Sequence, residues 1–159
     1  MVQGVNQFRY KFLHLVPKLV EDRIRAELVK QMDALVADLK ARAPVYTGPE
    51  THRSDGSRID PGALRDSIRW VWGKAPKGSV TLGEASTRFG DDSKDIRITV
   101  VAGGKGPWGD AFYARWVEFG TVKWAGSPFF WGTYRDRRRR IRGGITRALR
   151  AAIREANNV

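Results

Sequence analysis

A short glycine-rich segment has the spacing of a loop that binds dinucleotide phosphates: Gly104, Gly106 and Gly109. It follows the strand-like run Ile96–Val101, as that fingerprint requires. The rest of the context is missing, because Pro107 and Trp108 lie inside the loop and no strand–helix–strand unit surrounds it. Lys105 does not make a nucleotide phosphate loop either, since no Ser or Thr follows it. We therefore predict an ordinary glycine-rich connection between strands and no cofactor.

The side chains needed for hydrolytic, redox or metal chemistry are scarce. Cysteine is absent, which excludes disulfides, thiol nucleophiles and cysteine-ligated zinc. His14 lies beside apolar residues that suggest packing, and His52 lies in a polar stretch with two acids nearby, so neither indicates a metal site. A pair of carboxylates for acid–base catalysis would need Glu118 with Asp110, for example, and nothing in the spacing requires that pairing. We predict that the chain is not an enzyme and holds no metal.

The strongest signal for binding comes from arginine. The chain has 29 Lys and Arg against 17 Asp and Glu, a formal net charge of +12. Most of this excess lies between Arg135 and Arg154, where the only acid is Asp136. Like charges at this density repel along a helix, so a partner that neutralises them is favoured over a merely solvated helix end. The candidates are nucleic-acid phosphates or an acidic protein surface. The residues expected to contact that partner are Arg135, Arg137, Arg138, Arg139, Arg140 and Arg142.

A second candidate surface is the aromatic run Tyr113–Thr121. Interpreted as a strand, it directs Trp116 and Glu118 to one face and Val117 and Phe119 to the other, so both faces should be partly covered. The chain contains six tryptophans, more than so small a domain is expected to bury. A neighbouring subunit is therefore the expected partner for part of the aromatic surface.

Two long helices are predicted to hold these segments. The first should run from about Pro17 to Arg42 and end before Pro44, because apolar residues recur there at spacings of three and four: Val20, Ile24, Leu28, Met32, Leu35 and Leu39. The second should run from about Phe130 to Ala156, with a stripe of Ile141, Ile145, Leu149 and Ile153. The pair Gly143-Gly144 should kink or break it, since each glycine costs about 1 kcal/mol relative to alanine.

Apolar runs alternate with turns between the two helices. Ile96–Val101 is β-branched and alternating, which predicts a clear strand. A short turn after Ala63 leads into a strand at Trp70–Trp72, Gly73–Ser79 is predicted to be a hairpin connection, and Val80–Glu84 is a candidate partner strand. The order indicates an α+β fold, with a long N-terminal helix and a C-terminal helix packed on a small, mainly antiparallel sheet.

The length bounds the organisation of the chain. Its 159 residues fit a single domain, residues 1–159, and 42% apolar residues are enough for a core. We expect an N-terminal arm at 1–16, a polar loop or insertion at 45–62 and a basic C-terminal helix at 130–157. No apolar stretch is long enough to span a bilayer, and Met1 to Tyr10 lacks the apolar core of a signal peptide. We therefore expect a cytosolic product with no membrane partner.

Three blocks, in this order, resemble the tail-component family of long-tailed bacteriophages, small tail-completion or neck proteins. Ala43–Gly48, which follows the first helix, is similar to the family's "APVxTG", and Gly62–Ile68 is similar to "GxLRxSI". The third block is Tyr113–Thr121 with Pro128-Phe129, similar to "YAxxVExGT…PF". Family members usually run the first two blocks together, whereas residues 49–61 look like an insertion here. The arginine cluster is also heavier than the family's pattern.

The resemblance implies a structural virion protein without catalysis, which forms or joins a ring around the DNA channel where the tail meets the head. The implied partners are identical subunits in a six- or twelve-fold ring, the neighbouring head-completion and tail-tube proteins, and packaged DNA as a non-specific contact. The implied location is the head–tail junction of the virion, after synthesis in the host cytoplasm. A tail terminator ring and a non-specific nucleic-acid-binding protein remain the alternatives. In the ring, Glu118 is expected to pair with a neighbour's arginine, among subunit contacts at Tyr113, Trp116, Glu118, Phe119, Trp124, Pro128 and Phe129.

Overall fold

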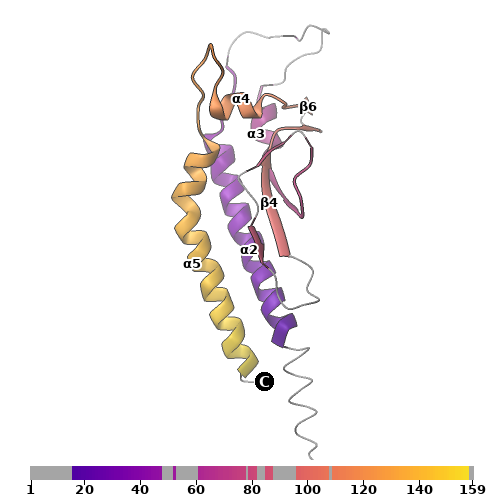
Figure 1. Ribbon diagram of the computed structural model, residues 1–159, viewed down its shortest axis with the longest axis vertical. Coiled ribbons are helices and arrows are strands. Elements are labelled where there is room, and N and C mark those ends of the chain that lie inside the picture. Colours follow the sequence, from indigo (N-terminus) through magenta and orange to yellow (C-terminus); the bar gives the residue numbers. More distant parts are fainter. Residues whose placement is uncertain are drawn as a thin grey trace, which may run out of the picture.

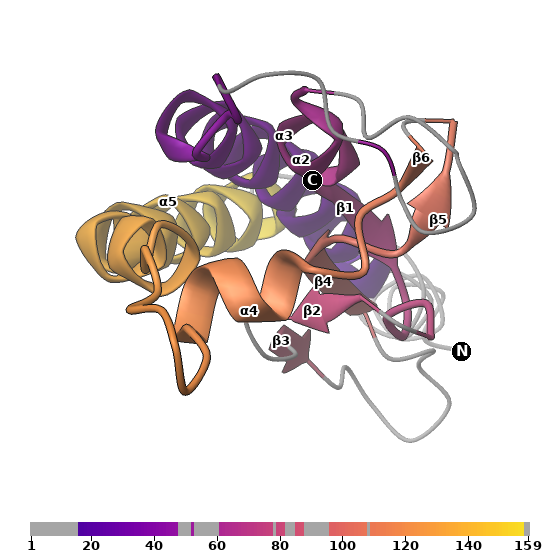
Figure 2. The ribbon, with the colours of Figure 1, turned by 90° about the horizontal axis from the view of Figure 1, so that it is seen from above.

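Two long antiparallel helices, α2 (Val16–Arg42) and α5 (Phe130–Asn157), pack along each other in the computed structural model, and a small sheet packs against α2 (Figures 1 and 2). The structure describes residues 16–47, 52, 61–77, 79–81, 85–87, 96–107 and 109–157. Almost all of the predicted arm and most of the predicted 45–62 loop lie outside these residues. The predicted α+β class, with two long helices and an antiparallel sheet, is confirmed.

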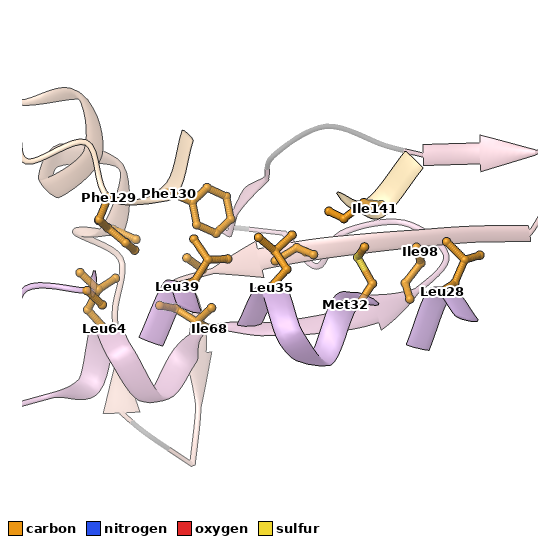
Figure 3. Close-up of a cluster of buried hydrophobic side chains, with 14 of the residues drawn as sticks. Leu28, Met32, Leu35, Leu39, Leu64, Ile68, Ile98, Phe129, Phe130 and Ile141 are labelled. Atoms are coloured by element: carbon orange, nitrogen blue, oxygen red, sulfur yellow. The ribbon is translucent and has the colours of Figure 1, made fainter. Parts of the chain in front are cut away.

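Helix α2 supplies one side of the core. All six residues of its predicted apolar stripe are buried, and Leu39 is fully covered. Figure 3 shows this stripe meeting Ile98 of the sheet and Ile141 of α5. Burying an aliphatic side chain of this size stabilises the folded state by roughly 1.5–3 kcal/mol. The stripe therefore fixes which face of α2 receives the other elements.

Helix α5 continues without a break through Gly143 and Gly144, so the predicted break there is wrong. Gly144 is buried where α5 approaches α2, and a Cβ atom there would lie 2.5 Å from Oε1 of Glu27 and 2.7 Å from Nε2 of Gln31. Packing against α2 thus offsets the low helix propensity of glycine. Of the predicted stripe on α5, Ile141 is buried but Ile153 is exposed, because Gly144 and Ala152 occupy fully covered positions of this helix.

Leucine at each of the two glycines should have opposite effects. Gly143→Leu is expected to raise the free energy of unfolding by about 0.5–1 kcal/mol, because the nearest atom to the new Cβ is the mobile Nη1 of Arg147 at 3.3 Å. Gly144→Leu should lower it by about 1–3 kcal/mol, because Gly144 is buried and the whole leucine side chain, in addition to displacing the ends of Glu27 and Gln31, would overpack the contact with α2. Urea unfolding of the two variants measures both changes. Equal effects at both positions would contradict the close helix contact.

The sheet is built around β4 (Ile96–Ala102). Strand β1 (Arg69–Trp72) pairs antiparallel along one edge, and β2 (Val80–Thr81) and β3 (Ala85–Thr87) pair along the other. Strands β1 and β2 therefore lie on opposite edges of β4 and do not pair with each other, so the predicted hairpin connection between them is wrong. The short flanking strands each find their backbone partners on β4, which is the longest strand and rich in β-branched residues.

The glycine-rich segment forms a small hairpin of β5 (Lys105–Gly106) and β6 (Gly109–Asp110). Just before it, Gly103 has φ +86°, and a Cβ there would lie 2.7 Å from the carbonyl oxygen of Ala111. The buried Ser67 hydroxyl accepts a hydrogen bond from the Gly103 N–H at 2.8 Å and donates one to the carbonyl of Leu64 at 2.6 Å. These contacts hold α3 (Ala63–Ser67) against the end of β4, beside the segment that carries the aromatic run.

Candidate interaction surfaces

The aromatic run forms a short helix, α4 (Ala114–Phe119), and not the predicted strand. The N–H of Val117 donates to the carbonyl of Tyr113 at 3.1 Å, and the N–H of Gly120 donates to that of Trp116 at 2.8 Å. A helical period was already present in the sequence, because aromatic residues recur at spacings of four and three: Phe112, Trp116 and Phe119. Gly120, with φ +79° and ψ −176°, ends the helix in a backbone conformation that is essentially restricted to glycine.

Glu118 caps the start of α5. Its side chain is buried, with 3% of the residue exposed. Oε2 accepts a hydrogen bond from the N–H of Phe130 at 2.8 Å, and Oε1 accepts one from the N–H of Trp131 at 2.9 Å. These N–H groups have no partner within the helix, and a carboxylate also complements the positive end of the helix dipole. Both oxygens are therefore satisfied inside the chain, while the predicted pairing with a neighbour's arginine stays a prediction.

A tight turn follows α4. Thr121 and Trp124 exchange backbone hydrogen bonds at 2.8 and 3.3 Å, which leaves Val122 at the tip with its side chain fully exposed. The chain then returns so closely that a Cβ at Gly120 would lie 2.5 Å from the backbone nitrogen of Gly126. Two glycines thus close a small projecting loop at the end of the molecule where α4 lies (Figure 1).

The predicted contact residues fall into two groups. Trp116 and Trp124 are each 50% exposed, Phe119 is 61% exposed and Pro128 is exposed. By contrast, Tyr113 is half-buried against the core, and Phe129 and Glu118 are buried. The prediction therefore combined surface residues with core residues. It treated the segment as a strand, and a strand pattern does not show which residues share one side of a helix.

Phe112 and Val122, two exposed apolar residues beside the predicted contacts, were missed. Phe112 is half exposed and contacts Trp116 edge-on, with ring centroids 5.3 Å apart, and Val122 lies at the loop tip. The helical spacing of Phe112 to Trp116 and Phe119 was the signal that could have identified the first. We use the term aromatic surface for the exposed set Phe112, Trp116, Phe119, Val122, Trp124 and Pro128.

A shallow depression connects the aromatic surface to α5. It is lined by Phe119, Pro128, Trp131, Arg135 and the buried Glu118. Its walls are mainly apolar, and Arg135 places one positive charge beside them. The two surfaces predicted separately from the sequence are therefore neighbours in the structure.

The arginine cluster is divided between the helix contact and the exterior. Arg137 forms an ion pair with Asp38 of α2, and this hydrogen bond holds the pKa of the Asp38 carboxyl below its ordinary value against the opposing effect of burial. Asp136 pairs with Arg42 at 2.7 Å. Arg137 thus fastens α5 to α2. The other predicted members are exposed: Arg135, Arg138, Arg139, Arg140 and Arg142.

The described residues hold no candidate metal site. No group of three His, Asp or Glu within them is arranged to hold a metal ion. His52 is exposed, and His14 lies outside the described residues. None of the helices in the described ranges is both long and apolar enough to cross a membrane.

Comparison with known proteins gives one match. Residues 10–120 match the family described as "Bacteriophage HK97-gp10, putative tail-component". The matched range includes the two upstream sequence blocks and α4, and it ends before α5. No curated protein and no solved structure matches the chain.

Proposed function

The chain belongs to the HK97-gp10-like family of bacteriophage tail components, and we propose that it is a tail-completion or neck protein of the head–tail connection. In this role it forms or joins a ring around the DNA channel and contacts the neighbouring head-completion and tail-tube proteins. It acts as a structural protein, without catalysis or cofactors. A tail terminator ring is the alternative place for it in the same joint.

The aromatic surface is the observation that carries the proposal. Large apolar side chains exposed together on a small domain are typical of a protein interface. Their positions are fixed from beneath, because the same short helix buries Ala114 and Glu118. Rigid aromatic residues lose little entropy on binding and supply much of the energy at the centre of an interface.

A closed ring requires that each subunit present two different patches. We propose that the aromatic surface is one of them. The projecting loop carries the exposed Val122 and half-exposed Trp124, whereas the depression beside Trp131 is concave. The projecting loop can insert into a different patch on the next subunit, as the heterologous contact of a ring requires.

The double variant Trp116→Glu/Phe119→Glu should abolish assembly. Both side chains are half exposed or more, so charge there should block an apolar interface while the monomer remains folded. Light scattering after size-exclusion chromatography measures the assembled mass, and circular dichroism checks the fold. Phage particles produced with the variant should be defective in joining heads to tails.

A control is Ile153→Glu, which introduces a single negative charge, half that of the double variant, at an apolar residue of similar exposure on the far part of α5. It should assemble as the unchanged chain does. Normal assembly of the double variant would refute the interface. Locating the protein in purified particles by cryo-electron microscopy distinguishes the neck from the tail terminator.

A further inference from the structure

We propose that the outer side of α5 binds the phosphate backbone of duplex DNA, and that this site extends well beyond the Arg135–Arg142 run. The residues of the site are exposed, and we call them the outer arginine face: Arg139, Arg140, Arg147, Arg150 and Arg154. This surface lies outside the range that matches the family.

The helix geometry aligns these arginines. Arg140, Arg147 and Arg154 recur every seven residues, so they drift by only about 40° around the helix over two repeats. At 1.5 Å per residue they extend over roughly 21 Å. Helix α5 lies at the left edge of the described structure in both ribbon views, with α2 beside it (Figures 1 and 2). The face is thus a continuous, accessible stripe.

The acids nearest to the stripe already have partners. Asp136 pairs with Arg42 of α2, and Glu155 pairs with Arg23 of α2, each at 2.7 Å. Asp38 forms its ion pair with Arg137, and the charge of the nearby Arg140 also helps to lower the pKa of the Asp38 carboxyl. Within the described ranges, no ion pair therefore neutralises the outer arginine face, and the repulsion along the helix remains to be relieved by a partner.

The chemistry of the face favours phosphates over an acidic protein. Between the arginines lie Gly143, Thr146 and Ala151, and the Thr146 hydroxyl donates back to the carbonyl of Arg142 at 2.9 Å. Ile153, 45% exposed, lies beside Arg154 at the end of the stripe, but none of the aromatic anchors on which a protein interface depends lies among these arginines. Guanidinium groups bind phosphate oxygens in a matching fork geometry.

The form of the nucleic acid also follows from the face. No aromatic residue lies among these arginines, so bases of a single strand have nothing to stack on. A duplex presents one negative charge per about 1.7 Å of its axis, or roughly 12 charges along a stripe of this length. The face itself predicts a duplex. The choice of DNA over RNA rests on the proposed function.

The test is binding of the full chain to a fluorescent duplex of arbitrary sequence, measured by anisotropy from about 50 to 200 mM salt. The triple variant Arg140→Gln/Arg147→Gln/Arg154→Gln should weaken binding at least tenfold. It should also make the slope of log K against log salt shallower by about 3, because each phosphate contact contributes about 0.9.

Two controls distinguish binding at the outer arginine face from the effect of the chain's total positive charge. Lys30→Gln/Lys74→Gln/Lys77→Gln removes three exposed charges elsewhere and should leave the slope within about one unit of the original. Arg137→Gln/Asp38→Asn removes a charge from the same run together with its partner acid, which would otherwise be free to pair with Arg140, so it should leave the slope unchanged. Circular dichroism confirms that each variant is folded.

Three results would overturn the site: no binding at the lowest salt, equal losses in both triple variants, or displacement of the duplex by polyglutamate at equal charge. The last result would assign the face to an acidic protein. The assay uses the unassembled chain, so it is independent of the assembly test. If the chain does not bind DNA while Trp116→Glu/Phe119→Glu abolishes assembly, only the DNA site is refuted. If the chain binds DNA while the double variant assembles normally, only the subunit interface is refuted.

Discussion

Replacement of Glu118 by alanine is expected to lower the free energy of unfolding by about 2–4 kcal/mol, because its buried carboxylate caps the start of α5. The substitution leaves the N–H groups of Phe130 and Trp131 without acceptors, and each unsatisfied buried donor costs about 1–3 kcal/mol. It also removes a negative charge from the positive end of α5. For a chain of this length the melting temperature should fall by roughly 5–15 °C.

Chemical unfolding of Glu118→Ala beside Glu118→Gln tests the capping role. Glutamine keeps the shape and one acceptor oxygen, so its loss should be smaller than that of alanine. Glu21→Ala removes an exposed carboxylate that pairs only with Arg25 within the same helix, and it should cost less than about 1 kcal/mol. If Glu118→Ala keeps full stability and only assembly is lost, the carboxylate is a subunit contact, as the sequence suggested.

Replacement of Gly120 by alanine is expected to cost about 3 kcal/mol or more. The backbone at this position, φ +79° and ψ −176°, disfavours any residue with a Cβ by about 1–3 kcal/mol. In addition, the new Cβ would lie 2.5 Å from the backbone nitrogen of Gly126 and 2.7 Å from the carbonyl oxygen of Trp124. Neither backbone atom can move without opening the loop that presents Val122.

Two further glycines provide controls for the two costs, the backbone conformation and the close contact of the new Cβ. Gly73 also has positive φ but open space around it, so Gly73→Ala should show the conformational cost alone. Gly132 lies in α5 without a positive φ or a near atom, and Gly132→Ala should be neutral or stabilise by up to about 1 kcal/mol. Urea unfolding of the three variants gives the comparison. An unchanged stability for Gly120→Ala would show that the loop is not closed as described.

The two long helices could be predicted because their evidence is local. The apolar stripe from Val20 to Leu39 repeats over about five helical turns, and no alternative structure gives those residues one common face. The strand Ile96–Val101 was equally clear from its alternation. Periodicity of this length decides the type of an element without knowledge of its neighbours.

The short elements could not be predicted in the same way. Segment 113–121 has a helical spacing of aromatic residues and also an imperfect alternation, and six residues do not decide between them. Its helix is stabilised by partners elsewhere in the chain, such as α5 through Glu118. Likewise, the partner of β2 depends on which side of β4 remains available, which no local pattern records.

The sequence by itself determined that two amphipathic helices enclose a small core, that arginine dominates the second helix and that the three blocks occur in the family's order. These properties depend on residue type and spacing along the chain. Only the tertiary structure decided that Glu118 caps a helix, that Gly144 permits a close helix contact and that Arg137 faces inward while Arg140 faces out. The reason is that burial and pairing are set by which surfaces meet, and those surfaces come from residues that are distant in the sequence.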